Sequence, residues 1–285
     1  MGKLAQRLLT FFVVVPILII LFFWDLWNHF PLILVTILVS ALGAFETGVI
    51  LTGKGFPVNR YLAPVLGISF PLLGYLEVVG LVTPLLTMIG VAILISLVFM
   101  RQIFTNKDLE IQTILHKVTG NLFVLIYPGL FLYFFVKFAH FPWASQAYFI
   151  FCFLTFGNDS FAWLFGSIFG KNSPKPIVVS PNKSVIGFVG GFLATIAVTT
   201  ASYWVFPEVM GFNILHNIIL GVILGFVTII GDLFESAIKR SAGTKDSGAI
   251  IPGRGGILDS IDSLMFSAPI FYLFLELIHT SRGLF

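Results

Sequence analysis

Charge is scarce in this sequence. Only 10% of the 285 residues are charged, whereas 58% are hydrophobic and the mean hydropathy is +1.02. A soluble domain averages about 25% charged and about 45–50% apolar residues, because it needs a polar shell against water. The composition therefore excludes an ordinary soluble fold and indicates lipid as the solvent. The formal net charge of +3 is too small to indicate a nucleic-acid partner.

Cysteine is almost absent as well. The single residue, Cys152, excludes an internal disulfide, and its apolar neighbours in the sequence indicate a packing role. No internal repeat is visible, so the two halves of the chain are unlike.

Long apolar runs make up most of the sequence. A helix that crosses a bilayer needs about 20 mostly apolar residues. The first run could pass for a signal peptide, but Trp24, Asp25 and Trp27 follow it instead of small residues, so we expect a retained helix. The runs predict an all-α polytopic membrane protein with about nine spans, at residues 8–27, 31–52, 61–77, 83–100, 119–137, 143–168, 185–206, 212–234 and 260–279.

The distribution of lysine and arginine predicts the orientation. Nine spans leave alternating segments, and one set holds all of the 16 basic residues except Lys137 and Arg282. Because basic loops stay cytoplasmic, we expect a cytoplasmic N-terminus and an outside C-terminus. With a bacterial source assumed, we expect the inner membrane as the location. We expect two membrane regions, 1–118 with spans 1–4 and 119–285 with spans 5–9, the second carrying cytoplasmic loops at 170–184 and 235–259.

Polar residues interrupt the apolar pattern at the end of the eighth span. Asp232, Glu235, Ser236 and Lys239 share one helical face, and Arg240 follows them. A carboxylate at the edge of the hydrocarbon needs a partner or a cation. The pattern fits either a cation site or an interfacial ion cluster in which Asp232 pairs with Lys239.

A glycine-rich loop comes next. Lys245 and Asp246 precede it, and Arg254, Gly255 and Gly256 end it. Glycines give the loop a flexible backbone whose N–H groups, together with the cationic side chains, are suited to binding phosphates. The spacing of the glycines is not that of a P-loop. An ordinary cytoplasmic turn is the alternative.

Two aspartates open the ninth span. Asp259 and Asp262 are three residues apart and face the same way on a helix. Hard oxygen ligands at this spacing suit Mg²⁺ held partly by water and substrate phosphate. Helix N-capping is the alternative, and it explains one aspartate better than two.

Two further carboxylates lie inside predicted spans. Asp159, next to Asn158 in the sixth span, has apolar residues on both sides and falls in the inner half of the membrane. An ionisable residue there indicates function by default, and a hydrogen bond to a neighbouring helix is the alternative. For Glu46, in the second span, we favour helix packing or support of a site formed by other residues.

These observations converge on one face of the membrane. The orientation uses only basic residues, yet it places the aspartates at or below the inner interface, beside lysines and arginines. Carboxylates and cations around glycine turns indicate a divalent-metal site for a polyphosphate, and hence phosphoryl or nucleotidyl transfer. The aspartates are Asp159, Asp232, Asp246, Asp259 and Asp262.

Residues 232–263 resemble the phosphatidate cytidylyltransferase family. Its signature runs Ser-x-x-Lys-Arg, Lys-Asp-x-Gly and Pro-Gly-His-Gly-Gly-x-x-Asp-Arg-x-Asp. Residues 158–191 resemble a second region of the family, so the likeness covers about the C-terminal half. The signature reads here as Ser236, Lys239, Arg240, Lys245, Asp246, Gly248, Pro252, Gly253, Arg254, Gly255, Gly256, Asp259, Ser260 and Asp262.

Three positions depart from the family pattern. Arg254 stands where the family usually has His, Ser260 where it has Arg, and Ile186 where it has Glu. If the usual Arg binds phosphate, Ser260 leaves that contact missing and Arg254 supplies a cation nearby.

The resemblance implies transfer of CMP from CTP to phosphatidate in phospholipid biosynthesis, with membrane lipids as partners and a homodimer left open. It implies Mg²⁺, with room for a second cation, on Asp246, Asp259, Asp262, Asp232 and Asp159. It implies catalytic roles for Asp246, Lys245, Lys239 and Arg240. The implied substrate-binding residues are Arg254, Gly255, Gly256, Ser236, Lys171, Ser180, Lys183 and Asn158.

Three other functions remain open at this point. A CTP-dependent transferase acting on another lipid phosphate or a polyprenol would share the same motif. A cation-coupled transporter would need essential charge at the midplane and paired halves, whereas here the charges gather at one face. A structural membrane subunit would leave the acidic cluster unexplained.

Overall fold

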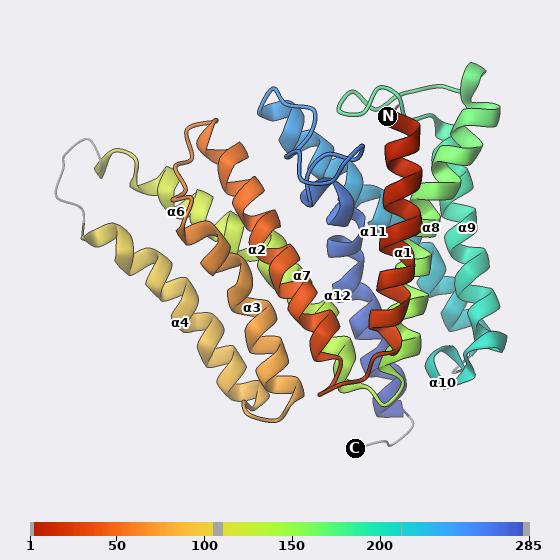
Figure 1. Cartoon of the computed structure of the whole chain (residues 1–285), viewed down its shortest axis with the longest axis horizontal. Coiled ribbons are helices and arrows are strands. Elements are labelled where there is room, and N and C mark those ends of the chain that lie inside the picture. Colours follow the sequence, from red (N-terminus) through yellow and green to blue (C-terminus); the bar gives the residue numbers. More distant parts are fainter. Residues whose placement is uncertain (1–2, 105–110, 212, 282–285) are drawn as a thin grey trace. The chain divides into compact units, whose positions relative to one another are not determined.

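A computed structural model describes residues 3–104, 111–211 and 213–281, and every named element among them is helical (Figure 1). Proline explains the π-helical turn η1, because Pro128 cannot donate the backbone bond that an α-helix requires there. The elements are α1 Lys3–Phe23, α2 Phe30–Thr52, α3 Leu62–Val78, α4 Pro84–Ile103, α6 Ile114–Val124, η1 Leu125–Leu130, α7 Phe131–Val136, η2 Lys137–His140, α8 Ala144–Phe169, η3 Gly170–Asn172, α9 Val185–Val205, α10 Pro207–Met210, α11 Ile214–Ser241 and α12 Leu258–Ser281.

The apolar helices confirm an all-α polytopic membrane protein. Within the described residues, seven helical segments are long and apolar enough to cross a membrane. Shorter apolar helices at 12–23 and 62–78 coincide with the first and third predicted spans. The exact span number and the orientation stay predictions, and Arg282, used in the orientation, lies outside the described residues.

The chain forms two compact units. The first unit comprises Met1–Ala139 and Ser241–Ser260, and the second comprises His140–Arg240 and Ile261–Phe285. The division of the chain at residue 118 stays a prediction, and 1–2, 105–110, 212 and 282–285 of its two regions lie outside the description.

Small residues let the helices of the first unit approach closely. A Cβ on Gly67 of α3 would lie 2.6 Å from the Ser40 carbonyl oxygen of α2, and the Ser40 hydroxyl donates to the Gly67 carbonyl at 2.7 Å. A buried ion pair adds to this packing, because Lys137 Nζ lies 2.5 Å from Glu77 Oε1. Close backbone approach is how helices associate in lipid, where burial from water supplies no driving force.

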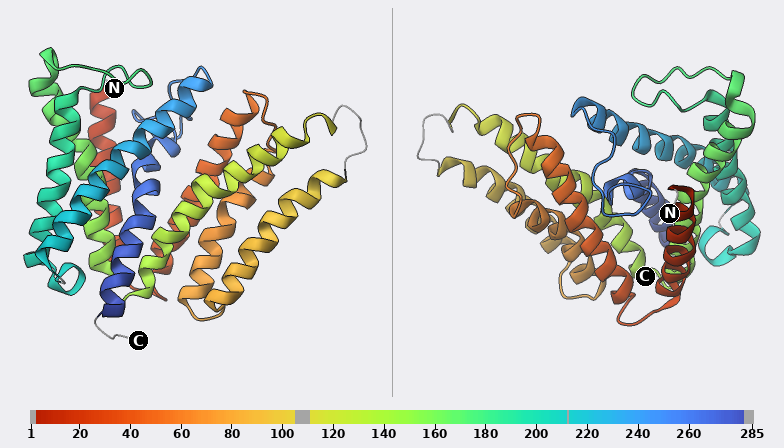
Figure 2. Two further views of the ribbon diagram at one scale, coloured as in Figure 1. Left: turned by 180° about the vertical axis from the view of Figure 1, so that it is seen from behind. Right: turned by 45° about the horizontal axis from the view of Figure 1, so that its top comes forward.

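The second unit uses the same device. α8 and α9 lie side by side (Figure 2), and a Cβ on Gly191 of α9 would lie 2.6 Å from the Asn158 carbonyl oxygen of α8. Asn158 Nδ2 donates to Thr195 Oγ1 at 2.8 Å, which joins the two helices by a buried hydrogen bond. On the other side of the unit, the hydroxyls of Thr228 on α11 and Ser267 on α12 are 2.9 Å apart.

One boundary differs from the sequence prediction. We expect a loop at 235–259, but α11 continues to Ser241, so the first residues of that segment are helical. The helix continues because Glu235 and Lys239, one turn apart, form an ion pair that stabilises the polar end. The eighth span is thus followed by about two further helical turns that carry charged side chains.

Candidate active site

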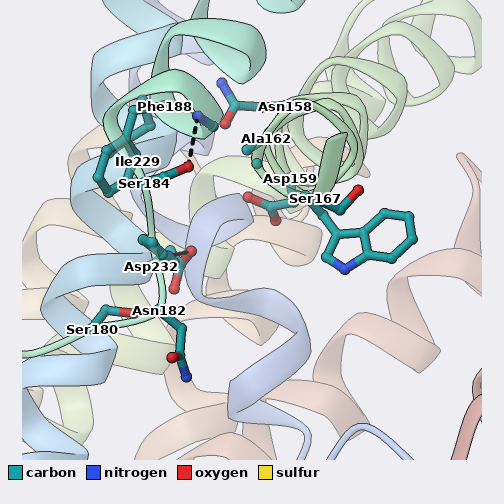
Figure 3. Close-up of a pocket in the computed structure, with 14 residues that line it drawn as sticks. Asn158, Asp159, Ala162, Ser167, Ser180, Asn182, Ser184, Phe188, Ile229 and Asp232 are labelled. Carbon is teal, nitrogen blue, oxygen red and sulfur yellow. Dashed lines mark hydrogen bonds and ion pairs between the residues drawn. The ribbon is translucent and has the colours of Figure 1, made fainter. Parts of the chain in front are cut away.

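A cavity of about 470 Å³ lies in the second unit, at the end where α8 finishes and α9 begins (Figure 3). Its wall comes from α8, the segment 173–184, α9 and α11. The lining residues are Asn158, Asp159, Ala162, Trp163, Gly166, Ser167, Ser180, Asn182, Lys183, Ser184, Gly187, Phe188, Ile229 and Asp232.

Ser184 shapes the cavity at the start of α9. Its hydroxyl accepts from the Gly187 N–H at 3.2 Å and so caps the helix. A Cβ on Gly170 or Gly166 would press against this hydroxyl, so glycine on α8 and after it makes room for the cap. Farther along the segment, Arg240 Nε at the end of α11 donates to the Val179 carbonyl at 3.4 Å.

Two lysines face carboxylates in this part of the unit. Lys183 forms an ion pair with Asp232, and Lys239 forms one with Glu235, which is fully buried on α11. The interfacial cluster considered from the sequence, with Asp232 bound to Lys239, is therefore wrong in its pairing. Glu235 is four residues before Lys239 and nearer along the helix face, which leaves Asp232 for a lysine from another segment.

The pKa of Lys183 lies below its ordinary value. Burial is the main cause, because it disfavours the charged ammonium form. Asp159 and Asp262 oppose the shift, and the like charge of Lys239 adds to it. Lys183 is thus a largely desolvated cation whose charge depends on the carboxylates around it.

The interactions of Lys183 identify a carboxylate-rich cluster. Four acidic side chains, Asp159, Asp232, Asp262 and Glu235, face two lysines, Lys183 and Lys239, which leaves a formal excess of two negative charges. The Ser263 hydroxyl donates weakly to Asp159 Oδ1 at 3.4 Å, so the interhelical partner considered for Asp159 exists. Among the described residues, no three His, Cys, Asp or Glu side chains are placed to hold a metal ion by themselves.

The glycine-rich loop belongs to the first unit. Ile251 N donates to the Gly255 carbonyl at 2.8 Å, and Gly255 N donates back to Ile251 at 3.1 Å, which closes a tight turn. Gly253 and Gly255 adopt φ angles of +77° and +115°, in the region that favours glycine. Lys245, Asp246 and Arg254 are exposed on this loop.

Two carboxylates bind the backbone of this loop. Asp259 Oδ2 accepts from Ser247 N at 2.9 Å and from Gly256 N at 2.7 Å. Glu46, on α2, accepts from Ile257 N at 3.0 Å and from Leu258 N at 2.9 Å. Two of the loop N–H groups considered from the sequence for phosphate, those of Ser247 and Gly256, are therefore already used within the protein.

The structure separates the sequence-predicted site residues into three groups. Those that line the cavity are Asn158, Asp159, Ser180, Lys183 and Asp232. Lys171, Ser236, Lys239, Arg240 and Asp262 belong to the same unit but do not line it. Those in the first unit are Lys245, Asp246, Arg254, Gly255, Gly256 and Asp259.

Sequence reasoning did not select several residues as site residues. Trp163, Asn182 and Ser184 line the cavity. Trp163 follows Asp159 by four residues on α8, so helical spacing alone could have placed the two on one face. The partners of Glu46 are about 200 residues away in the chain and carry no such signal.

The fold and the cavity define a polytopic helical membrane protein with a charged pocket at one end of a helix bundle. The cytidylyltransferase family matches residues 5–278, and the chain belongs to this family. The family likeness inferred from the sequence is thus confirmed, and the match extends through the N-terminal half that the motifs did not cover.

Individual relatives align with less of the chain. A phosphatidate cytidylyltransferase of Staphylococcus aureus strain COL is 44% identical over 41% of this chain and 44% of its own length. The phosphatidate cytidylyltransferase of Aquifex aeolicus is 38% identical over 53% of this chain and 54% of its own. The uncharacterized protein YnbB of Escherichia coli K12 is 41% identical over 43% and 40%. The chain therefore spans about half the length of the curated relatives it matches.

Proposed function

We propose that this protein transfers CMP from CTP to phosphatidate, giving CDP-diacylglycerol and pyrophosphate in phospholipid biosynthesis. The cavity that carries Lys183, Asp232 and Asp159 at the end of the helices is the observation that supports this most directly. Family membership and the names of the relatives support the reaction type. We place the cavity at the cytoplasmic face of the inner membrane, on the basic-residue pattern.

The reaction needs little proton transfer. A phosphate oxygen of phosphatidate attacks the α-phosphorus of CTP, the bond between the α-phosphorus and its bridging oxygen breaks, and pyrophosphate leaves with the electron pair. The attacking oxygen is already anionic, so catalysis consists of positioning and charge neutralisation. Lys183 is the cavity cation for this role, because an ammonium paired with one carboxylate can exchange it for a phosphate.

We assign Mg²⁺ to the carboxylates of the second unit. Their negative excess would repel a polyphosphate, unless a divalent cation lies between them. Mg²⁺ prefers carboxylate oxygens and keeps ligand positions for water and phosphate, so a complete protein cage is not required. Two of the aspartates Asp159, Asp232 and Asp262, together with water and substrate phosphate, would hold it, with room for a second cation. When bound, it would supply charge neutralisation to the CTP phosphates and to the departing pyrophosphate.

The first unit carries cationic side chains on the glycine-rich loop. The side chains of Lys245 and Arg254 are exposed to solvent, so we assign them to the binding of substrate phosphates. Asp246 keeps its proposed catalytic role and its proposed role as a metal ligand. Asp259 already receives donors from the loop on one oxygen, so we assign it first to holding the loop, ahead of metal binding.

The deciding experiment measures pyrophosphate release by purified protein in detergent, with CTP, phosphatidate and Mg²⁺. Lys183→Met should lower kcat/KM about 10²-fold or more, because it removes a positioned cation from the cavity. Lys175→Met, an exposed lysine of the same segment, is the matched control and should act like wild type.

Each alternative outcome has a distinct meaning. Release that survives Lys183→Met keeps the reaction and removes this cavity from it. Release only with another lipid phosphate or a polyprenyl acceptor moves the protein to a different CTP-dependent transferase. Absence of release with every acceptor contradicts the proposal and makes ion-flux assays of a transporter the next step.

A further inference from the structure

Glu46 is an unusual residue for its position in the fold. It lies on α2, one of the helices apolar and long enough to span the membrane, and only 3% of its surface is exposed. Burying a carboxylate is costly unless hydrogen-bond donors surround it. Its partners should therefore indicate why the chain keeps an acidic side chain here.

All the partners of Glu46 belong to the glycine-rich loop and the start of α12. Its Oε1 atom accepts from Ile257 N at 3.0 Å, and its Oε2 atom accepts from Leu258 N at 2.9 Å. The Ser247 hydroxyl donates to Oε2 at 2.9 Å. Both carboxylate oxygens are used, so an amide, which offers only one acceptor atom, cannot reproduce the arrangement.

The glycines of the loop fit around this carboxylate. A Cβ on Gly248 would collide with Glu46 Oε1, and a Cβ on Gly256 would collide with both oxygens of Glu46. From the sequence, Gly248 and Gly256 resemble residues of a phosphate-binding loop. In the structure, the absence of a side chain at these two positions lets the Glu46 carboxylate approach the loop backbone. The carboxylate of Glu46 also accepts from the N–H of Leu258, the first residue of α12, and from that of Ile257 just before it, the place where a helix favours an anion.

Ser247 links Glu46 to the second carboxylate that binds the loop. Its hydroxyl lies 2.9 Å from Glu46 Oε2 and 3.0 Å from Asp259 Oδ2, and it can donate to only one of them at a time. Glu46 holds the loop from α2, and Asp259 holds it from within α12. The loop that carries Lys245, Asp246 and Arg254 is therefore fixed from two sides.

We infer that Glu46 is a positioning residue: it holds the loop 245–258 in the conformation in which Asp246 and Arg254 can act on substrate. The inference rests on the proposed transferase function for its catalytic consequence, but its structural part stands apart from it. Glu46 itself contacts no substrate, and its effect passes through Ile257, Leu258 and Ser247.

Limited proteolysis tests the structural part without any assay of activity. Lys245 and Arg254 are exposed trypsin sites on the loop, so cleavage there reports local opening. Glu46→Gln should accelerate cleavage at these two sites roughly tenfold, because both backbone anchors cannot be kept. Ser247→Ala, which removes one hydroxyl and spares the buried carboxylate, should give a smaller acceleration and provides the answer if Glu46→Gln does not fold.

Glu77→Gln is the matched control. Glu77 is also a glutamate of the first unit with named partners, Lys137 Nζ at 2.5 Å and the Tyr133 hydroxyl at 2.9 Å, but none of them belongs to the loop. It should lower the melting temperature without changing cleavage at Lys245 and Arg254. Loop cleavage at the wild-type rate in Glu46→Gln and Ser247→Ala would overturn the inference.

The kinetic consequence has its own signature. In Glu46→Gln, kcat for pyrophosphate release should fall up to about 10²-fold with a smaller change in the KM for CTP, because misplacement by about 1 Å affects the reacting geometry most. Glu46→Asp, which keeps two acceptor oxygens, should recover part of this loss. Faster cleavage without any wild-type transferase activity would contradict the proposed function and leave the role of Glu46 in the loop intact.

Discussion

The carboxylates around the glycine-rich loop of the first unit and those around the cavity of the second unit have opposite roles. In the first unit, Glu46 and Asp259 accept hydrogen bonds from backbone N–H groups and a hydroxyl. In the second unit, Asp232 and Glu235 pair with the ammonium groups of lysines. Carboxylates thus fix the backbone conformation of the glycine-rich loop, whereas near the cavity they neutralise the charge of lysine side chains, which can rotate.

This difference separates structural from chemical roles. A backbone N–H cannot leave its carboxylate without a change of loop conformation, so such a contact stabilises a shape. A lysine side chain can rotate from a carboxylate to a phosphate while the backbone stays in place. We therefore expect substitutions at Glu46 and at the loop glycines to act through loop geometry, and substitutions of the charged residues that line the cavity to act through charge.

Asp232→Asn is the most direct test of the charge role of the cavity carboxylates, and we expect it to have the largest effect on kcat/KM. The variant keeps the shape of the side chain but removes a charge from the wall of the cavity, so kcat/KM should fall about 10²–10³-fold. The Mg²⁺ concentration required for half-maximal rate should rise, because a hard oxygen ligand is lost. Pyrophosphate release measured across a Mg²⁺ series checks both expectations.

Glu208→Gln is the control for Asp232→Asn. It also removes one negative charge from the second unit, on α10, at a residue that does not line the cavity. Its rate and Mg²⁺ dependence should match those of wild type. If the two variants behave alike, Asp232 serves Lys183 only as a structural partner, and the contrast between the units fails.

Gly256→Ala tests the first unit, where we expect geometry to dominate. The added Cβ would collide with the Ser247 hydroxyl and the Glu46 carboxylate, so these side chains must leave the positions in which they bind the loop. Overpacking of this kind costs about 1–3 kcal/mol, and the melting temperature in detergent should fall by several degrees.

Gly53→Ala provides the matched control in the same unit. Gly53 has a φ of −62°, and a Cβ there would meet only ordinary contacts at 3.5 Å or more. Its melting temperature should stay near that of wild type. A loss of stability in Gly53→Ala as large as in Gly256→Ala would show that the loop packing is not what matters.

Much of the fold could be predicted because lipid imposes a simple pattern. Each predicted apolar run coincides with a helix or a continuous helical segment, and most ends differ by only a few residues. The end of α11 at Ser241 was missed, because charged residues look like a loop when the sequence is read for hydropathy alone. Pairing of Glu235 with Lys239 is what continues the helix.

The candidate site was harder to predict, since its contacts join distant segments. Sequence reasoning found Asp159 and Asp232 as polar exceptions and Lys183 as a substrate-binding candidate, but the pairing of Lys183 with Asp232 crosses 49 positions. No periodicity encodes such a pair. Glu46 shows the same limit more strongly, because its donors become neighbours only after the loop has folded back on α2.

Thr195→Val should have the smallest effect, because it removes a hydrogen bond between helices and no charge. Its hydroxyl accepts from Asn158 Nδ2 at 2.8 Å between α8 and α9, and valine keeps the shape while leaving that amide without its acceptor. Interhelical hydrogen bonds in membranes contribute about 0.6–2 kcal/mol, so the melting temperature should fall by a few degrees while kcat/KM stays near wild type. Thr200→Val is the control, because its hydroxyl bonds to Ile196 within the same helix. A large loss of activity in Thr195→Val at unchanged melting temperature would instead assign Asn158 to substrate binding, because the amide would then be oriented for the cavity and not for α9.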